Sequence, residues 1–224
     1  MNKLLVVEDK SINSGEYILD IKKDVSLNIN GNVVIHDINS DNNWLDIIIE
    51  NNCNFDLYQV KKLQNDYYIH ITLLNNAILN LNMLILNENN HQVKVDIDMT
   101  YDNSIASTHV RALNIQEDSN LDIVFKGYIK EKTKGNELVE DLKGFITKNN
   151  DTIKISPIMI VDTNEVLANH LVTIGNFNTE ELFYLESLGL SEKTAKDMLI
   201  ESFMKQNMSE VELEFLKLGG DKDE

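Results

Sequence analysis

The chain has 224 residues, 42% of them hydrophobic, and a formal net charge of −17. This strong negative charge argues against a nucleic-acid-binding protein, which needs clustered Lys and Arg, and against docking on an anionic membrane surface. The single cysteine, Cys53, excludes an intrachain disulfide and a thiolate metal cage built by this chain alone.

The region from residue 1 to about residue 169 consists of short stretches with apolar residues at alternate positions. Examples are VSLNIN, YIHITLL and VKVDIDM. A period of two is typical of β-strands, and no clear helix separates these stretches. Only ELVEDLKGF (137–145) is ambiguous between strand and helix. The sequence therefore predicts a long, mainly β region.

A weak internal repeat runs through this region, with starts that differ by 24, 42 and 32 residues. Steps of roughly 20 to 30 residues are the size of one coil of a β-solenoid, in which an Asn at a turn can hydrogen-bond to the next coil. An antiparallel β-sandwich gives similar strands but usually more than the 9 Gly and 1 Pro found here. We therefore favour the solenoid. The repeat units are NNCNFDL from Asn51, NNAILNL from Asn75, EDSNLDI from Glu117 and NNDTIKI from Asn149.

Three residues in the β region invite a functional reading, and for each we expect a structural role. Cys53 aligns with Ala77 and Ser119 in the repeat, which indicates a small residue facing a tight interior rather than a reactive thiol. Arg111, the only arginine, lies in HVRALNI and is expected to face outward or to form a salt bridge. His109 lies on the same strand face.

After His170 the pattern becomes helical, with three helix starts that carry capping residues. Apolar residues recur at helical spacing in each segment, and Gly189 ends the first one. Three short helices cannot bury both of their faces, so one face must dock on the β body or on a partner. The caps are Asn178 with Glu181, Ser191, and Ser209 with Glu212, the last opening a helix through Leu216.

We therefore predict three parts: a β-helix core over 1–169, a C-terminal helical module over 170–218, and a disordered tail over 219–224. No basic-then-apolar signal segment is visible, and no apolar run approaches the roughly 20 residues that span a bilayer. A cytoplasmic protein is the expectation.

The usual signatures of enzymes do not occur. There is no Gly-rich phosphate loop, H-E-x-x-H motif, nucleophile elbow or CxxC pair. A β-helix enzyme that acts on acidic polysaccharide would need basic groups among its carboxylates, and one arginine makes that reading unattractive. The sequence predicts a protein that is not an enzyme.

From residue 156 to residue 203 the chain carries, in order, Pro157 before an apolar strand, His170 in ANHLVTIG, a Phe-Tyr-Leu run from Phe183 and an Ala-containing helix that ends in Phe203. This segment resembles the C-terminal region of the SufB/SufD family, the scaffold subunits of the SUF iron–sulfur cluster assembly machine. Upstream, 104–129 resembles the family's strand with a Phe-x-Gly step, at Phe125 and Gly127. The combination is specific because its elements occur in order. The matching residues are Pro157, Val166, His170, Thr173, Ile174, Gly175, Phe183, Tyr184, Leu185, Ser187, Gly189, Ala195 and Phe203.

This resemblance implies a right-handed parallel β-helix followed by a small α-helical module. It also implies a non-catalytic scaffold whose β-helix pairs with SufB or with a second copy and whose helices dock the SufC ATPase. The expected SufC-binding residues are Phe183, Tyr184, Leu185, Leu188, Met198 and Phe203. Two other readings stay open: a β-helix carbohydrate-active enzyme, or a degenerate solenoid with a purely structural role.

In the element ANHLVTIG, His170 lies where the strand pattern gives way to the helical one. A lone His without a neighbouring ligand cluster is usually structural. The chain resembles SufD rather than SufB, because NNDTIKISP before Pro157 lacks the cysteine of SufB. His170 matches a SufD histidine, which implies a candidate iron–sulfur ligand at the partner interface, although Leu171, Val172 and Leu188 depart from the family pattern. We expect no cofactor in the isolated chain and a transient cluster only within the complex.

Overall fold

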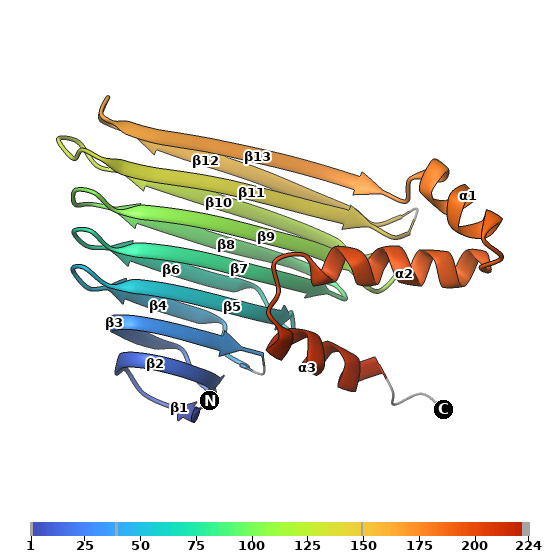
Figure 1. Cartoon of the computed structure of the whole chain (residues 1–224), viewed down its shortest axis with the longest axis horizontal. Coiled ribbons are helices and arrows are strands. Elements are labelled where there is room, and N and C mark those ends of the chain that lie inside the picture. The colour runs from blue at the N-terminus through green and yellow to red at the C-terminus, as the bar shows by residue number, and fades with distance from the viewer. Residues whose placement is uncertain (1, 39, 149, 221–224) are drawn as a thin grey trace.

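The computed structural model describes residues 2–38, 40–148 and 150–220 (Figure 1). Over these residues the chain forms thirteen strands followed by three helices. The strands are β1 (Asn2–Val6), β2 (Lys10–Ile21), β3 (Val25–Asp37), β4 (Trp44–Ile49), β5 (Asn54–Lys62), β6 (Tyr67–Leu73), β7 (Ile78–Asn87), β8 (Asn90–Met99), β9 (Ile105–Asn114), β10 (Asn120–Ile129), β11 (Asn136–Ile146), β12 (Thr152–Val161) and β13 (Val166–Asn176). The helices are α1 (Thr179–Ser187), α2 (Glu192–Lys205) and α3 (Glu210–Gly220).

The strands form a parallel β-solenoid, as predicted. Each described strand pairs in parallel, in the order β12-β10-β8-β6-β4-β3-β5-β7-β9-β11-β13. The even-numbered and odd-numbered strands thus make two stacks, which join at β3. The first half of β3 pairs with β4 and its second half with β5. Each later coil contributes one strand to each stack, and the two stacks are visible as the front and back layers in Figure 1.

The core lies between the two stacks. Side chains alternate between buried and accessible along each strand, as in β6 and β10. In parallel pairing, residues in register face the same side, so Leu57 and Leu81 stack in the apolar interior, and Thr108 and Glu140 continue the same column in later coils. Cys53, Ala77 and Ser119 are all buried, which confirms the prediction of small residues at a tight interior corner.

Asparagines at the coil turns bond to the neighbouring coil, as predicted. Asn52 and Asn76 have positive φ angles, and the Asn76 side-chain amide donates to Asn52 Oδ1 at 2.9 Å. The backbone N–H of Asn75 likewise donates to Asn51 Oδ1 at 3.1 Å. Asn tolerates the left-handed conformation that these tight turns require. The richness in Asn therefore has a structural cause.

The irregular repeat also has a structural explanation. The turn at Asn51 and the turn at Asn75 precede β5 and β7 of one stack, 24 residues apart in register. The turn at Glu117 precedes β10 of the other stack, so the step of 42 residues joins two different corners of the solenoid. The segment 137–145, ambiguous from sequence, lies in β11, where alternate residues are buried.

The change from strand to helix occurs later than predicted. The β region was expected to end at residue 169, but β13 continues to Asn176 and α1 begins at Thr179. The reason is that LVTIGN keeps the strand alternation and stays in register with β11 as far as Ile146. At the other end, α3 extends to Gly220, so the predicted tail starts too early. Its residues 221–224 lie outside the described residues.

The helices lie along the outer face of the odd-numbered stack, at the carboxyl ends of its strands (Figure 1). The Phe203 ring of α2 packs against Phe145 of β11 at 5.2 Å between centroids, and Phe177 meets Phe145 edge-on at 5.1 Å. Farther along, the chain returns to β3 near the first coils, where Glu212 of α3 contacts His36. Of the two predicted places for a helix face, the β body or a partner, the structure shows contacts with the β body.

Candidate functional site

The solenoid ends in an open face formed by β12 and β13. These are the two terminal strands of the sheet order, so one edge of each has no neighbouring strand among the described residues. Proline within a sheet is confined largely to such strands, and the only proline, Pro157, lies in β12. Several large apolar side chains are exposed on these strands: Ile158, Ile160, Val161, Leu167, Leu171 and Ile174. We call these two strands the open end.

The open end combines two features that favour association. An unpaired strand edge is a template for pairing with another chain, and native proteins usually blunt it with charge or cover it. Here Leu167 is 67% exposed and Leu171 is 54% exposed on the same strand. Large exposed apolar side chains beside a free strand edge are typical of an interaction site.

His170 lies in the middle of β13 rather than at a strand–helix junction. It is in register with Glu140 of β11, which is fully buried and therefore faces the interior. Val166 and Val172 share this orientation and pack on the core. His170 therefore lies on the inward face of the last strand, and it is exposed because no further coil covers it.

The described residues contain no group of three or more His, Cys, Asp or Glu side chains that could hold a metal ion. His170 is the one such side chain on the inward face of β13, and Glu140 lies beside it on the next strand. Two ligands leave most coordination positions of an iron ion or cluster open. Any metal bound here would need further ligands from outside the described residues.

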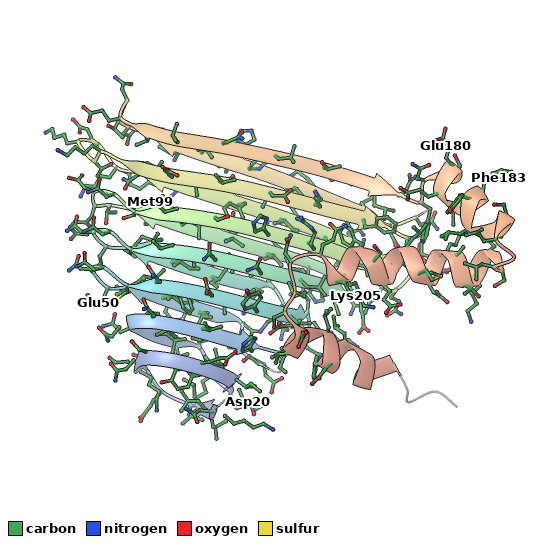
Figure 2. The ribbon with its side chains drawn as sticks, viewed as in Figure 1. Asp20, Glu50, Met99, Glu180, Phe183 and Lys205 are labelled. Carbon is green, nitrogen blue, oxygen red and sulfur yellow. The ribbon has the colours of Figure 1, made fainter. Side chains whose placement is uncertain are left out.

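The first helix presents a strongly exposed apolar surface. Phe183 is 73% exposed and Tyr184 and Leu188 are each 63% exposed, while Leu185 is half-buried. No residue of α1 is buried, and Phe183 lies at the end of the molecule remote from β1 (Figure 2). Met198 adds an exposed apolar side chain on α2. Four of these five residues are thus free to contact a partner.

Phe203 does not fit the docking role that the sequence suggested. It is only 9% exposed, because its ring packs against Phe145 of the last coils. In this structure Phe203 fixes α2 on the β body. Ala195, which lies earlier on the same helix α2, is also buried. The face of α2 that carries these two residues is therefore used internally.

Arg111 forms a salt bridge, one of its two expected roles, but it does not face solvent. Its guanidinium contacts Asp141 Oδ2 at 2.6 Å and donates to Gln206, the residue that follows α2, at 3.3 Å. His109 Nδ1 lies 3.5 Å from the same carboxylate. Burial opposes ionisation of Asp141, but Arg111 outweighs it and lowers the pKa of that carboxyl. The structural reading of Arg111 and His109 agrees with these contacts.

A buried polar cluster that sequence reasoning missed holds α3. His36 Nδ1 lies 2.6 Å from Glu212 Oε1, and both side chains are buried. Glu16 Oε1 lies 3.2 Å from the other ring nitrogen, and Tyr58 stacks on the imidazole at 5.4 Å. Glu212 also accepts from the Ser209 backbone N–H at 3.0 Å, as its predicted capping box requires. The capping box was readable from sequence, but its contact with His36, 176 residues away, was not.

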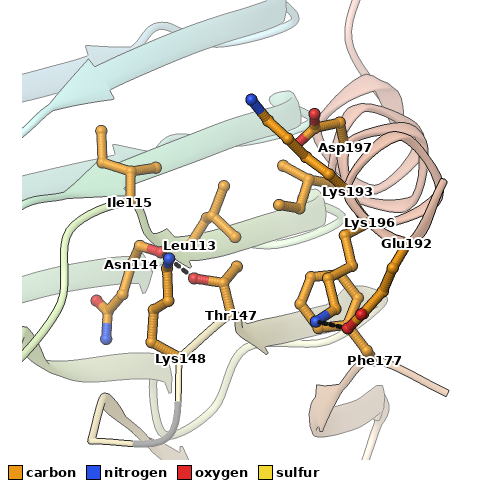
Figure 3. A pocket seen from close by; sticks show the side chains of 11 residues that line it. Leu113, Asn114, Ile115, Thr147, Lys148, Phe177, Glu192, Lys193, Lys196 and Asp197 are labelled. Carbon is orange, nitrogen blue, oxygen red and sulfur yellow. Dashed lines mark hydrogen bonds and ion pairs between the residues drawn. The ribbon is translucent and has the colours of Figure 1, made fainter. Parts of the chain in front are cut away.

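A cleft of about 570 Å³ separates α2 from the ends of β9 and β11 (Figure 3). Its lining mixes Lys148, Lys193 and Lys196 with Glu192 and Asp197. The Lys196 ammonium is paired with Glu192 at 2.6 Å, as the dashed line in Figure 3 marks. A cleft with balanced charges lacks the single-sign field that attracts a charged substrate. We therefore assign it no catalytic role.

The fold thus defines a parallel β-solenoid protein with C-terminal helices on its outer face. The family model for the SufBD core domain of the SUF system for FeS cluster assembly matches residues 65–203. An iron–sulfur cluster assembly SufBD family protein of Pyrococcus horikoshii is 29% identical over 86 residues, which is 38% of this chain and 19% of that protein. The match to this relative thus spans about a fifth of the relative's length.

The chain belongs to the SufBD family. The family model covers most of the solenoid together with α1 and nearly all of α2. Membership connects the chain to iron–sulfur cluster assembly and confirms the family that the motifs after Pro157 predicted. Among the described residues, none of the helices has the length and apolar character needed to cross a membrane.

Proposed function

We propose that this chain is a SufD-like, non-catalytic scaffold subunit of the SUF iron–sulfur cluster assembly complex. The observation that carries the proposal is the open end, where exposed apolar side chains lie on two strands with free edges. A family member that exposes such a surface needs a partner to cover it. The partner is SufB or a second copy of this chain, joined through β12 and β13.

The SufC ATPase docks on α1 and the exposed part of α2. Phe183, Tyr184 and Leu188 supply an apolar anchor surface, with Leu185 and Met198 at its border. Aromatic residues of this kind dominate binding energy when a partner excludes water from them. The burial of Phe203 supports a rigid α2 that holds this surface in place.

His170 supplies one ligand to a transient iron–sulfur cluster at the interface with the partner. Its place on the inward face of the last strand supports this role, because a partner that covers the open end would enclose it. The cluster is cargo of the complex and not a resident cofactor of this chain. The remaining ligands come from the partner.

The docking part of the proposal is tested by co-purification of the tagged chain with its cognate ATPase. Phe183→Ala together with Tyr184→Ala should abolish the complex, since both rings are largely exposed on α1. The matched control is Tyr101→Ala, which removes an exposed aromatic ring at a coil turn of the β body. No complex with the wild-type chain, while α1 and α2 remain folded, would refute SufC docking.

The pairing part is tested by the mass of the assembly in solution, alone and with SufB. Leu171→Lys places a charge on the exposed face of β13 and should dissociate the pair. Leu5→Lys introduces the same charge at an equally exposed leucine of β1, at the opposite end of the solenoid, and should leave the pair intact. Equal effects of the two substitutions would contradict pairing through the open end.

A further inference from the structure

Glu140 is a fully buried carboxyl group for which the described residues provide no hydrogen-bond partner. Both of its side-chain oxygens are buried and unpaired. Asp37 and Asp141 also carry one unpaired oxygen, but the second oxygen of Asp37 accepts from Gln59 and that of Asp141 accepts from Arg111. Burial alone raises the pKa of Glu140 to about 7. Leaving such a buried group without a hydrogen-bond partner is unfavourable.

The residues around Glu140 leave space for its carboxyl group without bonding to it. Gly127 lies across the interior, and a Cβ atom there would come within 2.7 Å of Glu140 Oε1 and would collide with Leu138. Thr108, in register on the other side, donates its hydroxyl to the Val139 carbonyl at 3.1 Å. Its proton is therefore not available to Glu140. The described residues thus leave space for this carboxyl group but provide no hydrogen-bond donor to it.

On the side of Glu140 away from Thr108 lies the open end, from which a partner can approach. Glu140 of β11 is in register with His170 of β13, and both side chains face the interior. Met159 of β12 is in register with Gly127, so it lies above the space that the carboxyl occupies. β12 and β13 form the last coil, and His170 is exposed. A ligand that reaches His170 at the open end thus arrives one strand away from the unpaired carboxyl.

We propose that Glu140 is a second metal-ligating residue beside His170, so that the two form an imidazole–carboxylate half-site for a divalent iron ion at the open end. The inference rests on the proposed function, which places His170 at a partner interface. In-register residues on neighbouring parallel strands carry side chains about 5 Å apart, a separation that lets both reach one ion. Imidazole and carboxylate together suit Fe²⁺, and the partner across the open end completes the coordination.

The pairing of these two residues also explains why a costly buried acid lies in this coil. A metal ion between them would replace the missing hydrogen-bond donor with a positive charge and would fix the imidazole. Metal binding here displaces one proton from the carboxyl when it is protonated and leaves the neutral imidazole as the second ligand. No oxidation or bond cleavage is involved.

The test is titration of the full-length chain with Co²⁺, an N,O-binding stand-in for Fe²⁺, followed by calorimetry and by visible absorption. The wild-type chain should bind Co²⁺. Glu140→Gln and His170→Ala should each weaken binding about tenfold or more. The matched control is Glu137→Gln, the same substitution at an exposed position of the same strand, which should change nothing.

Thermal unfolding provides a second measurement of Co²⁺ binding, which does not depend on visible absorption. Co²⁺ should raise the midpoint of the wild-type chain and of Glu137→Gln, by mass action, but not that of Glu140→Gln. Without metal, Glu140→Gln should unfold no earlier than wild type, since the exchange removes a buried ionisable group of the same shape.

The outcomes separate this inference from the proposed function. Wild-type affinity in Glu140→Gln, or no Co²⁺ binding by the wild-type chain, would overturn the half-site. Loss of Co²⁺ binding in both Glu140→Gln and His170→Ala supports it, even if the chain forms no complex with the ATPase. The absence of a complex with the ATPase would defeat the scaffold proposal alone, because α1 lies beyond the carboxyl end of β13 whereas Glu140 and His170 lie in the middle of their strands (Figure 1).

Discussion

The buried pair of His36 and Glu212 determines how firmly α3 is held on the β body, and Glu212→Gln isolates its charge. The substitution keeps the shape of the side chain and an oxygen that can accept from Ser209, so the helix cap is preserved. What is lost is the carboxylate 2.6 Å from His36 Nδ1. The amide group that remains is a much weaker partner for a charged imidazole.

The expected loss follows from the burial of the pair. Removing one member of a buried ion pair costs about 3–5 kcal/mol when the other stays charged. His36 can release its proton and keeps Glu16 at 3.2 Å, so the lower value for a hydrogen bond to a charged group, about 2 kcal/mol, applies. The population with α3 detached should therefore rise about 30-fold.

The contribution of this pair also depends on pH. Burial lowers the pKa of His36, but the hydrogen bonds and charges of Glu212 and Glu16 raise it overall above 6.5. Because the folded-state pKa is the higher one, the stabilisation is complete below about pH 6.5 and is lost as the pH rises through the folded value. Protection of α3 should thus decrease from pH 6 toward pH 9.

Hydrogen exchange of the α3 amides, corrected for intrinsic rates, measures this local opening. Glu212→Gln should lower the protection of α3 about 30-fold at pH 6 and flatten its pH dependence. Glu210→Gln, an exposed substitution in the first turn of the same helix, is the control. Equal protection of α3 in both variants would refute the role of the buried pair.

Three further predictions concern the β body. Asn76→Ala should lower the free energy of unfolding by about 1–2 kcal/mol in urea titrations, and Asn76→Gly by less, because the residue has a φ angle of 55°. Gly127→Ala should cost about 1–3 kcal/mol because the added Cβ collides with Leu138, and a wild-type midpoint would contradict this. The carboxylate of Asp98 contributes most to raising the pKa of His70 to about 9, so its stabilisation is present below pH 6.5 and lost toward pH 9. His70→Gln should therefore flatten that decline, by up to about 2 kcal/mol, in unfolding measured across this range.

The solenoid could be predicted from sequence because its two main signals are local. Alternation of apolar residues fixes which face of a strand is buried, and asparagine pairs at turns mark the corners. The strand register could not be predicted, because it depends on which residues of one coil pair with which residues of the next coil. The repeat from Asn75 to Glu117 illustrates this: similar turns occur at two different corners, so similarity in sequence does not identify neighbours in space.

The candidate site residues also divide into those whose environment is local, and could be predicted, and those whose environment depends on distant strands, and could not. The exposure of Phe183 could be expected, since nothing in a short helix buries such a ring. The burial of Phe203 could not, because it depends on Phe145 of a distant strand. Glu140 and His170 are separated by a full coil in sequence, and only the register of β11 and β13 makes them neighbours. Motif resemblance pointed to the histidine and gave no hint of the carboxyl.

The C-terminal helices contact an early strand, β3, and two late strands, β9 and β11, and this has a consequence for how the chain unfolds. Coils that contact only their neighbours behave as a one-dimensional array, which can fray one unit at a time from either end. Here α2 is fixed on β9 and β11 through Arg111 and Phe145, whereas α3 is fixed on β3 through His36. Loosening the coils that contain β3 or those that contain β9 and β11 therefore also breaks contacts of the helical segment. The helices thus couple coils that do not touch one another. We therefore expect thermal unfolding of the solenoid to be more cooperative than it would be for stacked coils without these helices.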